Sequence, residues 1–243
     1  MSHAPTPIID LGQAGPSEHE WNAVCAALPP FVWPSRERLV VVSPHPDDET
    51  LGSGGAMSAA AQRGMGIVLL SVTDGEAAFD ELGLAARRRG EVTAALAVLV
   101  GDGRAEHHFA SLPDGAVSDA VEQLVTIITA TIRPNDLVIT PLPDDGHPDH
   151  AATARAAAAA CSTVGAALWH APIWAWHCHA PATSSIRRGR RVELTDEDRR
   201  RKRLAVECFP SQTGGLEPVV PPMMLTRLTR DFEVLVPANH EVS

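Results

Sequence analysis

The sequence predicts an α/β protein in which an open, mostly parallel sheet carries helices on both faces. From about residue 38 onward, short apolar runs rich in β-branched residues alternate with longer segments that have helical spacing. This alternation is typical of βαβ units, whose parallel strands are joined by right-handed crossovers. The run 67–72 is almost entirely apolar, as expected for a strand that is buried on both faces.

The individual elements follow from these patterns. The expected strands span residues 39–43, 67–72, 107–109, 137–140, 168–174 and 232–236. The expected helices between them span residues 54–64, 85–99, 117–132 and 148–163. This order is Rossmann-like, and in such open sheets ligands bind beyond the carboxyl ends of the strands.

The expected organisation is one domain, residues 36–243, preceded by an N-terminal extension, residues 1–35, that packs on it. A chain of 243 residues, 44% hydrophobic and 21% charged, can form one large core. In the extension, Ser17 with Glu20 three residues later predicts a capping box at the start of a short helix.

The composition argues against several classes of partner. The formal net charge of −10 disfavours binding to nucleic acid or to an anionic membrane surface. No apolar run approaches the roughly 20 residues of a membrane span, and the N-terminus lacks a signal-peptide pattern. The four cysteines are scattered and indicate no thiolate metal site. We therefore expect a cytoplasmic protein without stable membrane insertion, and a homo-oligomer is compatible with the sequence.

Residues 187–203 carry a dense set of charges. Four arginines precede the acidic run 196–198, and five basic residues follow it, at 199–203. One interpretation is a mobile, solvated loop followed by an exposed helix start. The other interpretation is a basic lid over an anionic group of a substrate, such as a phosphate.

A first cluster of ionisable residues directly follows the first expected strand. His45, Asp47, Asp48 and Glu49 lie within five residues, in a loop that two prolines stiffen. Groups packed this tightly repel one another unless a cation joins them. An imidazole together with carboxylates suits zinc, with a water molecule in the open coordination position.

A second cluster, residues 144–150, follows the fourth expected strand. Pro148 suits the first position of the next helix, where its missing N–H is not needed, so Asp149 and His150 fall in the first turn. In a doubly wound sheet, the ends of the first and fourth strands are neighbours at the switch point. The two clusters are therefore expected to meet in space.

Together, the motif at residues 44–49 and the motif at residues 147–150 resemble the PIG-L, or LmbE-like, zinc-dependent de-N-acetylases. The resemblance begins at about residue 36 and includes segments 73–76, 88–91, 112–115 and 202–212. Two positions depart from the family pattern. Asp145 stands where some members carry a tyrosine, and Phe209 stands where many members carry a histidine.

The resemblance implies one zinc ion per chain, held by His45, Asp48 and His150 with one coordination position open. It implies that Asp47 is the general base. These roles suit amide hydrolysis, because zinc lowers the pKa of bound water to about 7 and a neighbouring carboxylate can take the proton.

The resemblance also implies roles for residues around this centre. His147 would stabilise the tetrahedral intermediate or help to protonate the leaving amine, and Asp149 would orient the ring of His147. Arg88 and Asp114 match positions that bind sugar hydroxyls. An alternative for Arg88 is a charged helix face on which it pairs with Glu91, three residues further along.

The function implied is hydrolysis of a carbon–nitrogen amide bond, removing an N-acetyl group from a glucosamine-containing small molecule or glycoconjugate. An alternative is a zinc amidase that cleaves a larger acyl group from an amino-sugar conjugate. Two further classes are a non-catalytic sugar-binding protein of the same fold and a nucleotide-binding Rossmann protein. The last is suggested because Gly52 and Gly54 follow a strand and Asp74 lies 20 residues beyond Gly54.

Overall fold

The computed structural model describes residues 9, 15–79, 81–215 and 218–238. Within these residues, a seven-stranded sheet has the order β3-β2-β1-β4-β5-β7-β6. The parallel strands are β1 (Arg38–Ser43), β2 (Gly66–Ser71), β3 (Ala105–Phe109), β4 (Leu137–Pro141) and β5 (Ala167–Ala171). Two antiparallel pairings add β7 (Phe232–Pro237) and β6 (Arg190–Glu193) at one edge. The predicted fold class is confirmed.

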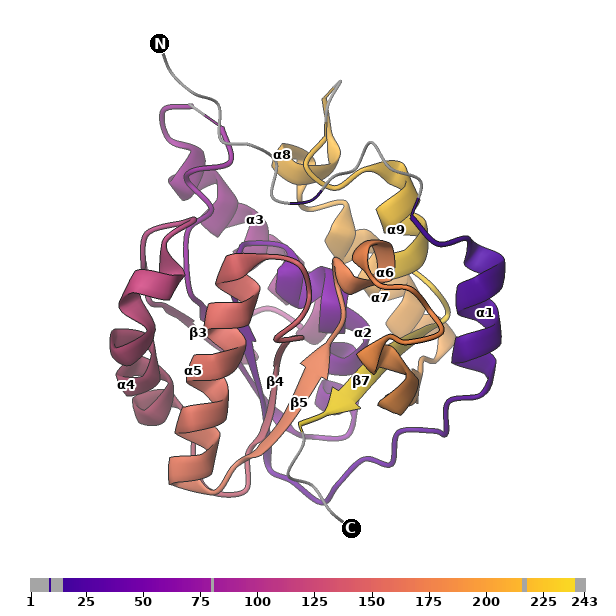
Figure 1. The fold of residues 1–243 in the computed structure, drawn as a ribbon. Helices are drawn as coiled ribbons and strands as arrows, with labels where there is room; N and C mark the ends of the chain where they lie inside the picture. The colour runs from indigo at the N-terminus through magenta and orange to yellow at the C-terminus, as the bar shows by residue number, and fades with distance from the viewer. Residues whose placement is uncertain (1–8, 10–14, 80, 216–217, 239–243) are drawn as a thin grey trace.

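Helices cover both faces of the sheet, because alternate side chains of its strands point to opposite sides. Leu39 and Val41 of β1 belong to one buried cluster, whereas Val40 and Val42 belong to another. The first face is covered by α2 (Asp48–Gln62), α3 (Leu84–Val100) and α7 (Asp196–Val206), and the second by α4 (Val121–Thr131) and α5 (Pro148–Val164) (Figure 1). Among the described helices, none is both long and apolar enough to cross a membrane.

Shorter helices gather beyond the carboxyl end of the sheet and beside it. They are α6 (Ala175–Cys178), α8 (Pro210–Thr213), α9 (Pro222–Leu228) and the outer helix α1 (Glu18–Ala26) (Figure 1). The predicted capping box of α1 is confirmed at Ser17 and Glu20. Trp21 is fully buried, and its indole N–H donates to the carbonyl oxygen of Trp176 at 2.8 Å. Residues 1–8 and 10–14 of the expected extension lie outside the described residues.

Helix α2 begins six residues earlier than predicted, at Asp48 instead of residue 54. It is interrupted at Ser53, whose φ of −145° and ψ of 17° are not helical. The small residues around this kink hide the helical periodicity in the sequence. The early start matters for the site, because it places Asp48 and Glu49 in the first turn, where the helix dipole favours negative charge.

The structure corrects the expected mobile loop and the expected basic lid at residues 187–203, whereas the expected exposed helix start is present at Asp196. The expected mobile loop contains strand β6, and α7 begins with a capping box between Thr195 and Asp198. Glu197 forms ion pairs with Arg200 and Arg201, so these charges are neutralised within the helix. A cavity of about 420 Å³ opens at residues 45–48, and no described arginine of this segment lines it, which argues against a basic lid.

A buried ion pair holds the kink of α2. Lys202 donates to Glu233 Oε1 at 2.5 Å and to the carbonyl oxygen of Leu51 at 2.8 Å. The Glu233 carboxylate accepts the backbone N–H groups of Gly55 and Ala56 at 2.8 and 2.7 Å. These contacts replace hydrogen bonds that a continuous helix would make, so the geometry of the loop before α2 depends on residues far along the chain.

Replacing Lys202 with Met is therefore expected to destabilise the fold by about 3–5 kcal/mol, because the buried Glu233 loses its cation. The free energy of unfolding, measured with urea, tests this expectation. The matched control is Arg200→Met, which breaks an exposed pair with Glu197 and should change stability by at most about 1 kcal/mol. Equal effects of the two substitutions would contradict the role given to Lys202.

Candidate metal centre and active site

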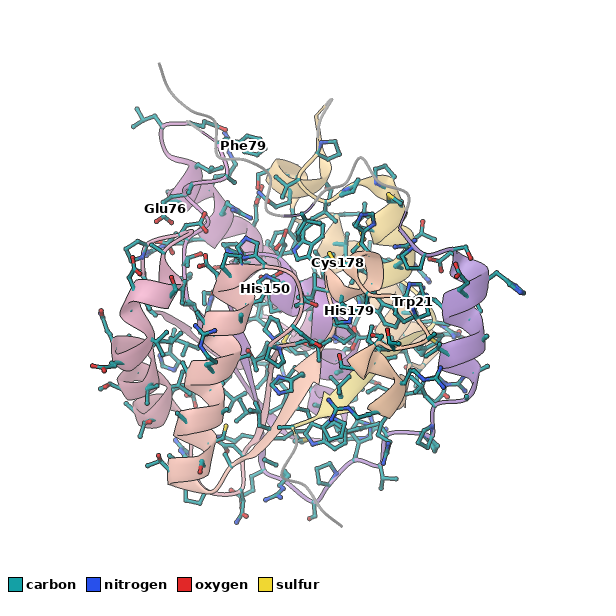
Figure 2. All side chains as sticks on the ribbon, viewed as in Figure 1. Trp21, Glu76, Phe79, His150, Cys178 and His179 are labelled. Atoms are coloured by element: carbon teal, nitrogen blue, oxygen red, sulfur yellow. The ribbon has the colours of Figure 1, made fainter. Side chains whose placement is uncertain are left out.

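The two predicted clusters meet at the carboxyl end of the sheet. Strands β1 and β4 are hydrogen-bonded neighbours, so the loop that carries His45 lies beside the loop that carries His150. Figure 2 shows His150 inside the molecule, at the end of the sheet under the short helices. His150 is fully buried and Asp48 is 5% exposed. The sequence prediction that these segments come together is confirmed.

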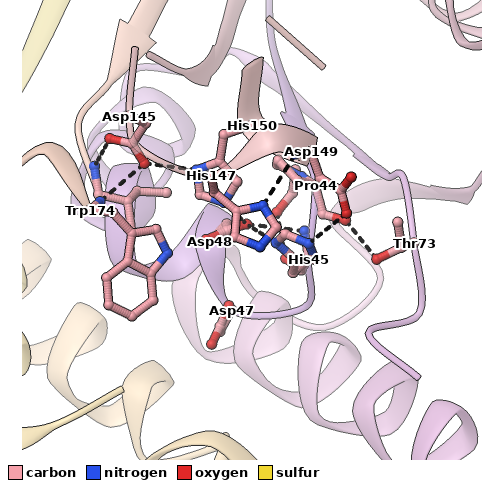
Figure 3. A network of polar contacts seen from close by, with 12 residues as sticks. Pro44, His45, Asp47, Asp48, Thr73, Asp145, His147, Asp149, His150 and Trp174 are labelled. Atoms are coloured by element: carbon pink, nitrogen blue, oxygen red, sulfur yellow. Dashed lines mark hydrogen bonds and ion pairs between the residues drawn. The ribbon is translucent and has the colours of Figure 1, made fainter. Parts of the chain in front are cut away.

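The three predicted metal ligands converge on one another. Asp48 Oδ2 lies 3.1 Å from His45 Nδ1 and 3.1 Å from His150 Nε2 (Figure 3). The contact to His150 Nε2 lacks hydrogen-bond geometry, and this buried atom has no hydrogen-bond partner among the described residues. Two ligands of a tetrahedral zinc ion, each about 2.1 Å from it, lie roughly 3.4 Å apart. This His/Asp cluster therefore fits a metal site.

Two other sets of possible ligands share His45. His45, His147 and His150 offer atoms within 4.8 Å of one another, and so do His45, Asp114 and Asp149. The second set lies on the Nε2 side of His45, at 3.3 Å from each carboxylate. The set His45, Asp48 and His150 differs from the second set because it contains His150 Nε2, a buried atom without a hydrogen-bond partner among the described residues.

The electrostatics of the cluster favour added positive charge. Burial alone would lower the pKa of His45, but the three carboxylates around it outweigh burial and raise its pKa well above the usual value. Burial likewise opposes the charged form of His150, yet Asp48 and Asp145 raise its pKa to about 9. The pKa of Asp48 is lowered, because the two imidazoles overcome its burial. These carboxylates can stabilise protons on the rings or a cation between them.

Asp145 is a functional residue that the sequence did not reveal. Its Oδ2 lies 2.7 Å from His150 Nδ1, and its carboxylate accepts the backbone N–H groups of Ile173, Trp174 and Ala175 at 2.9–3.0 Å (Figure 3). It therefore holds His150 with Nε2 toward the metal site, as carboxylates behind ligating histidines do. The same contacts end β5 three residues before the predicted residue 174. In the sequence, Asp145 was noted only because some members of the family carry a tyrosine at this position.

Asp47 is prepared to accept a proton. Its φ of 125° is unusual for a residue other than glycine and stores strain on the order of 1–3 kcal/mol. Its carboxylate faces the cavity, and no described residue donates a hydrogen bond to it (Figure 3). Burial, followed by repulsion from Asp48, raises its pKa well above the usual value, and Arg88 opposes the rise. Glu49 fixes the loop, since its Oε2 accepts the N–H of Asp47 at 3.2 Å.

His147 lines the same cavity as a neutral ring. Burial, together with the neighbouring His45 and His150, lowers its pKa to about 3. Its Nδ1 accepts the backbone N–H of Asp149 at 3.2 Å, so the proton of the neutral ring lies on Nε2. The structure differs from the expected contact between the Asp149 carboxylate and His147. That carboxylate instead faces His45, because the N–H groups of Gly115 and Val117 fix it there.

A cavity of about 420 Å³ opens beside these residues. Its polar wall consists of His45, Asp47, Asp48, Arg88, Asp114, His147 and Gln212. Most of the remaining wall is apolar, with Leu51, Ile173, Trp174, Val219, Val220, Met224 and Leu228. A volume of this order suits a small-molecule site, for which roughly 300–1,000 Å³ is typical.

Arg88 lines this cavity and does not form the expected charged helix face. It is 3% exposed and donates to the carbonyl oxygens of Gly75 and Pro46 at 2.7 and 3.1 Å. The alternative pairing with Glu91 is wrong, because Glu91 accepts the N–H and hydroxyl of Ser211. One buried donor of Arg88, Nε, has no partner among the described residues.

Gly75 makes room for the Arg88 guanidinium. A Cβ at residue 75 would overlap Arg88 Nη1, and the φ of +65° also favours glycine. Gly75→Ala is therefore expected to displace Arg88 and to lower kcat/KM by about tenfold or more, while metal content stays unchanged. Gly83→Ala is the matched control, since that glycine has a similar φ of +83° and open space around it. Equal losses of kcat/KM in the two variants would contradict the role of Gly75.

The dinucleotide-binding alternative is not supported by the geometry. Gly52 and Gly54 lie inside helix α2, not in a phosphate-binding turn before it. Asp74 forms a two-pronged ion pair with Arg89, at 2.5 and 2.8 Å, so its carboxylate is not directed at a ribose. The loop from His45 to Glu49 occupies the place where a pyrophosphate would approach a helix N-terminus.

Comparisons with known proteins agree with this site. The sequence model of the PIG-L family, described as GlcNAc-PI de-N-acetylase, matches residues 40–161. The chain is 34% identical over 164 residues to a 1D-myo-inositol 2-acetamido-2-deoxy-alpha-D-glucopyranoside deacetylase from Rhodococcus opacus (strain B4). The match covers 54% of this chain and 55% of the relative, so the chain spans about half the length of this curated relative.

Solved structures share the fold. A deacetylase triple mutant of the teicoplanin biosynthetic pathway is 24% identical with a TM-score of 0.64, covering 84% of this chain and all of that one (100%). GalB, the 4-carboxy-2-hydroxymuconate hydratase from Pseudomonas putida KT2440, is 20% identical with a TM-score of 0.63, covering 85% and 98%. Since these two proteins carry different activities on one fold, the activity must be argued from the site residues.

Proposed function

Because the chain belongs to the PIG-L family, we propose that it is a zinc-dependent hydrolase that removes an N-acetyl group from a glucosamine-containing molecule. The observation that carries this proposal is the convergence of His45, Asp48 and His150, beside a cavity that Asp47 lines. The acetamido sugar in the name of the Rhodococcus opacus relative supports the proposed class of substrate.

One zinc ion per chain would be held by His45, Asp48 and His150. A zinc ion in such a site supplies a Lewis acid that lowers the pKa of water to about 7 and polarises an amide carbonyl. The donor set fits zinc, which accepts two imidazoles and a carboxylate. The carboxylates of Asp145 and Asp149 lie on the far sides of the two rings and fix their orientation.

Asp47 and His147 would carry the proton and charge transfers. Asp47, with its raised pKa, takes a proton from the attacking water and delivers it to the amine nitrogen as the C–N bond breaks. His147, with its proton on Nε2, donates a hydrogen bond to the carbonyl oxygen as negative charge develops there. A pKa of about 3 makes His147 a hydrogen-bond donor in its neutral form, and disfavours its use as an imidazolium acid.

Arg88 and Asp114 would bind sugar hydroxyls from the same side of the cavity. Arg88 supplies a cation with an unpartnered donor, and Asp114 supplies a carboxylate that also contacts His45. Asp114 thereby connects substrate binding to the orientation of a metal ligand. Losing a hydrogen bond from either residue is expected to weaken binding of the transition state by about 1–3 kcal/mol.

Metal analysis combined with product analysis tests the proposal. We expect one zinc per chain, and equal amounts of acetate and free amine from a panel of N-acetylglucosamine conjugates. A chelator should abolish the release and added zinc should restore it, with iron(II) and cobalt(II) as comparisons. A zinc-replete protein that binds the conjugates without releasing amine would support the non-catalytic alternative. Release of amine also separates hydrolysis of an amide from hydration of a double bond.

A further inference from the structure

The cavity has two unlike halves on opposite sides of the metal centre. The sheet order places the carboxyl ends of β2 and β3 on one side of β1 and β4. The carboxyl end of β5 and the amino end of the antiparallel β7 lie on the other side. Figure 2 shows Glu76, from the loop after β2, and Cys178, from the segment after β5, on opposite sides of His150. Arg88 and Asp114 lie on the first side, where the groups for sugar hydroxyls are.

The second half of the cavity is built from apolar side chains. Ile173 and Trp174 follow β5, and Met224 and Leu228 come from α9. With Leu51 and Val220, they belong to one hydrophobic cluster, in which Trp174 is partly buried. Among the described residues that line the cavity, every charged or titratable side chain comes from the metal centre or from the β2 and β3 side.

The apolar half begins directly beside the metal centre. The single carboxylate of Asp145 contacts both the ring of His150 and the backbone N–H groups of Ile173 and Trp174. Leu51 lies one turn after Asp47, and its N–H donates to the Asp47 carbonyl oxygen at 2.8 Å. Apolar surface therefore lies directly beside the residues of the metal centre.

An amide at this centre has two parts, the amine and the acyl group. With the amino sugar on the polar side, where Arg88 and Asp114 lie, the apolar side is open to the acyl group. An acetyl methyl group would contact little of this wall and would leave the rest facing water, whereas a longer chain would bury it. We infer that this site takes, besides N-acetyl groups, amino-sugar conjugates whose N-acyl group is a medium-length apolar chain, bound against Ile173, Trp174, Val219 and Met224.

This inference rests on the proposed amide hydrolysis and extends it from N-acetyl to longer N-acyl groups. Water supplies a hydroxyl group to the acyl carbon, and the C–N bond breaks. The amine nitrogen takes the proton that Asp47 delivers. The products are a carboxylate with an apolar chain and a free amino sugar, and the step needs no oxidant or reductant.

A series of substrates that differ only in the acyl group tests the inference. The zinc-loaded enzyme is given methyl glucosaminides with N-acetyl, N-butanoyl, N-hexanoyl and N-octanoyl groups, and release of free amine is measured. We expect kcat/KM to be at least about tenfold higher for N-hexanoyl than for N-acetyl, because one added methylene in an apolar pocket can contribute about tenfold. Activity on N-acetyl that falls as the chain lengthens would overturn the inference but leave the proposed function standing.

A second arm separates an apolar acyl group from an apolar aglycone. Octyl N-acetylglucosaminide carries its chain on the amine part, so it should not share the gain. If it were the better substrate and N-hexanoyl were not, the orientation of the two halves would be wrong. A zinc-replete enzyme that cleaves no member of either series would overturn both the inference and the proposed function.

A substitution at Val219 tests whether the apolar wall binds the acyl chain. It is partly buried, so Val219→Trp fills the acyl half of the cavity without entering the core. We expect the ratio of kcat/KM for N-hexanoyl to that for N-acetyl to fall by about tenfold or more. Val32→Asp is the control, since Val32 is 81% exposed and outside the cavity lining. An unchanged ratio in Val219→Trp would overturn the assignment of this wall.

Discussion

Replacing Asp47 with Asn is expected to lower kcat by about 10²–10⁴-fold while bound zinc stays stoichiometric. The amide has the shape of the carboxylate and tolerates the positive φ of residue 47. It cannot accept a proton from water, so the loss falls on turnover. Zinc content and kcat measured on the same preparation test the expectation.

Asp48→Asn is the matched variant, since Asp48 is the next residue and has the same side chain. Its Oδ2 lies 3.1 Å from both His45 and His150, so the substitution should weaken metal binding, and added zinc should restore part of the activity. A metal-free Asp47→Asn protein together with a zinc-replete, inactive Asp48→Asn protein would show that the two roles are reversed.

The pH dependence follows from the raised pKa of Asp47. The residue acts only when it is deprotonated, so kcat/KM should fall as the pH is lowered through this raised pKa. The residual activity of Asp47→Asn should lack that acidic limb. If the limb persisted at the same pH, another group would be responsible for it.

Stability provides an independent control for the same variant. Because the pKa of Asp47 is higher in the folded protein than its usual value of 3.8, the folded state holds the proton more tightly than the unfolded state. The ionised carboxylate therefore destabilises the fold at pH values above the raised pKa. Asp47→Asn should be at least as stable as the parent protein at pH 8, which excludes unfolding as the cause of lost turnover.

The meeting of the two clusters could be predicted from the sequence because each cluster lies in one short segment at the end of a strand. His45 and Asp48 follow an apolar strand, and His150 follows a helix-starting proline, so their meeting required only that two strands be neighbours. The residues that fix the rings were harder to predict. Asp145 acts through backbone N–H groups after β5, and the Asp149 carboxylate through those of Gly115 and Val117. Every residue except proline has a backbone N–H, so the sequence does not show which of these groups bind a carboxylate.

The elements that were misplaced have a common cause. Helix α2 continues past its kink because Lys202 and Glu233 replace the hydrogen bonds that are missing there, and both lie far along the chain. Strand β6 was missed because its arginines suggested a solvated loop, although pairing with β7 orders it. In both cases, long-range contacts outweighed the local pattern.

Replacing His150 with Ala is expected to remove most of the bound zinc and with it the activity. The ring is fully buried, and its Nε2 lies 3.1 Å from Asp48 Oδ2 without a hydrogen-bond partner among the described residues. The alanine variant therefore lacks a donor nitrogen at this position. Asp145→Asn should act through the same ring. Removing a carboxylate behind a ligating histidine typically weakens metal binding by about 10–100-fold.

His147→Ala provides the decisive comparison for this ligand set. His147 offers a nitrogen within 4.8 Å of His45 and His150, but we assign it to the substrate carbonyl. The variant should therefore keep its zinc and lose turnover, whereas His150→Ala should lose both. Zinc affinity measured for His147→Ala, His150→Ala and Asp48→Asn separates the alternatives. If His147→Ala lost the metal and Asp48→Asn kept it, the ligands would be His45, His147 and His150. The imidazole of His147 would then be the third ligand in place of the Asp48 carboxylate.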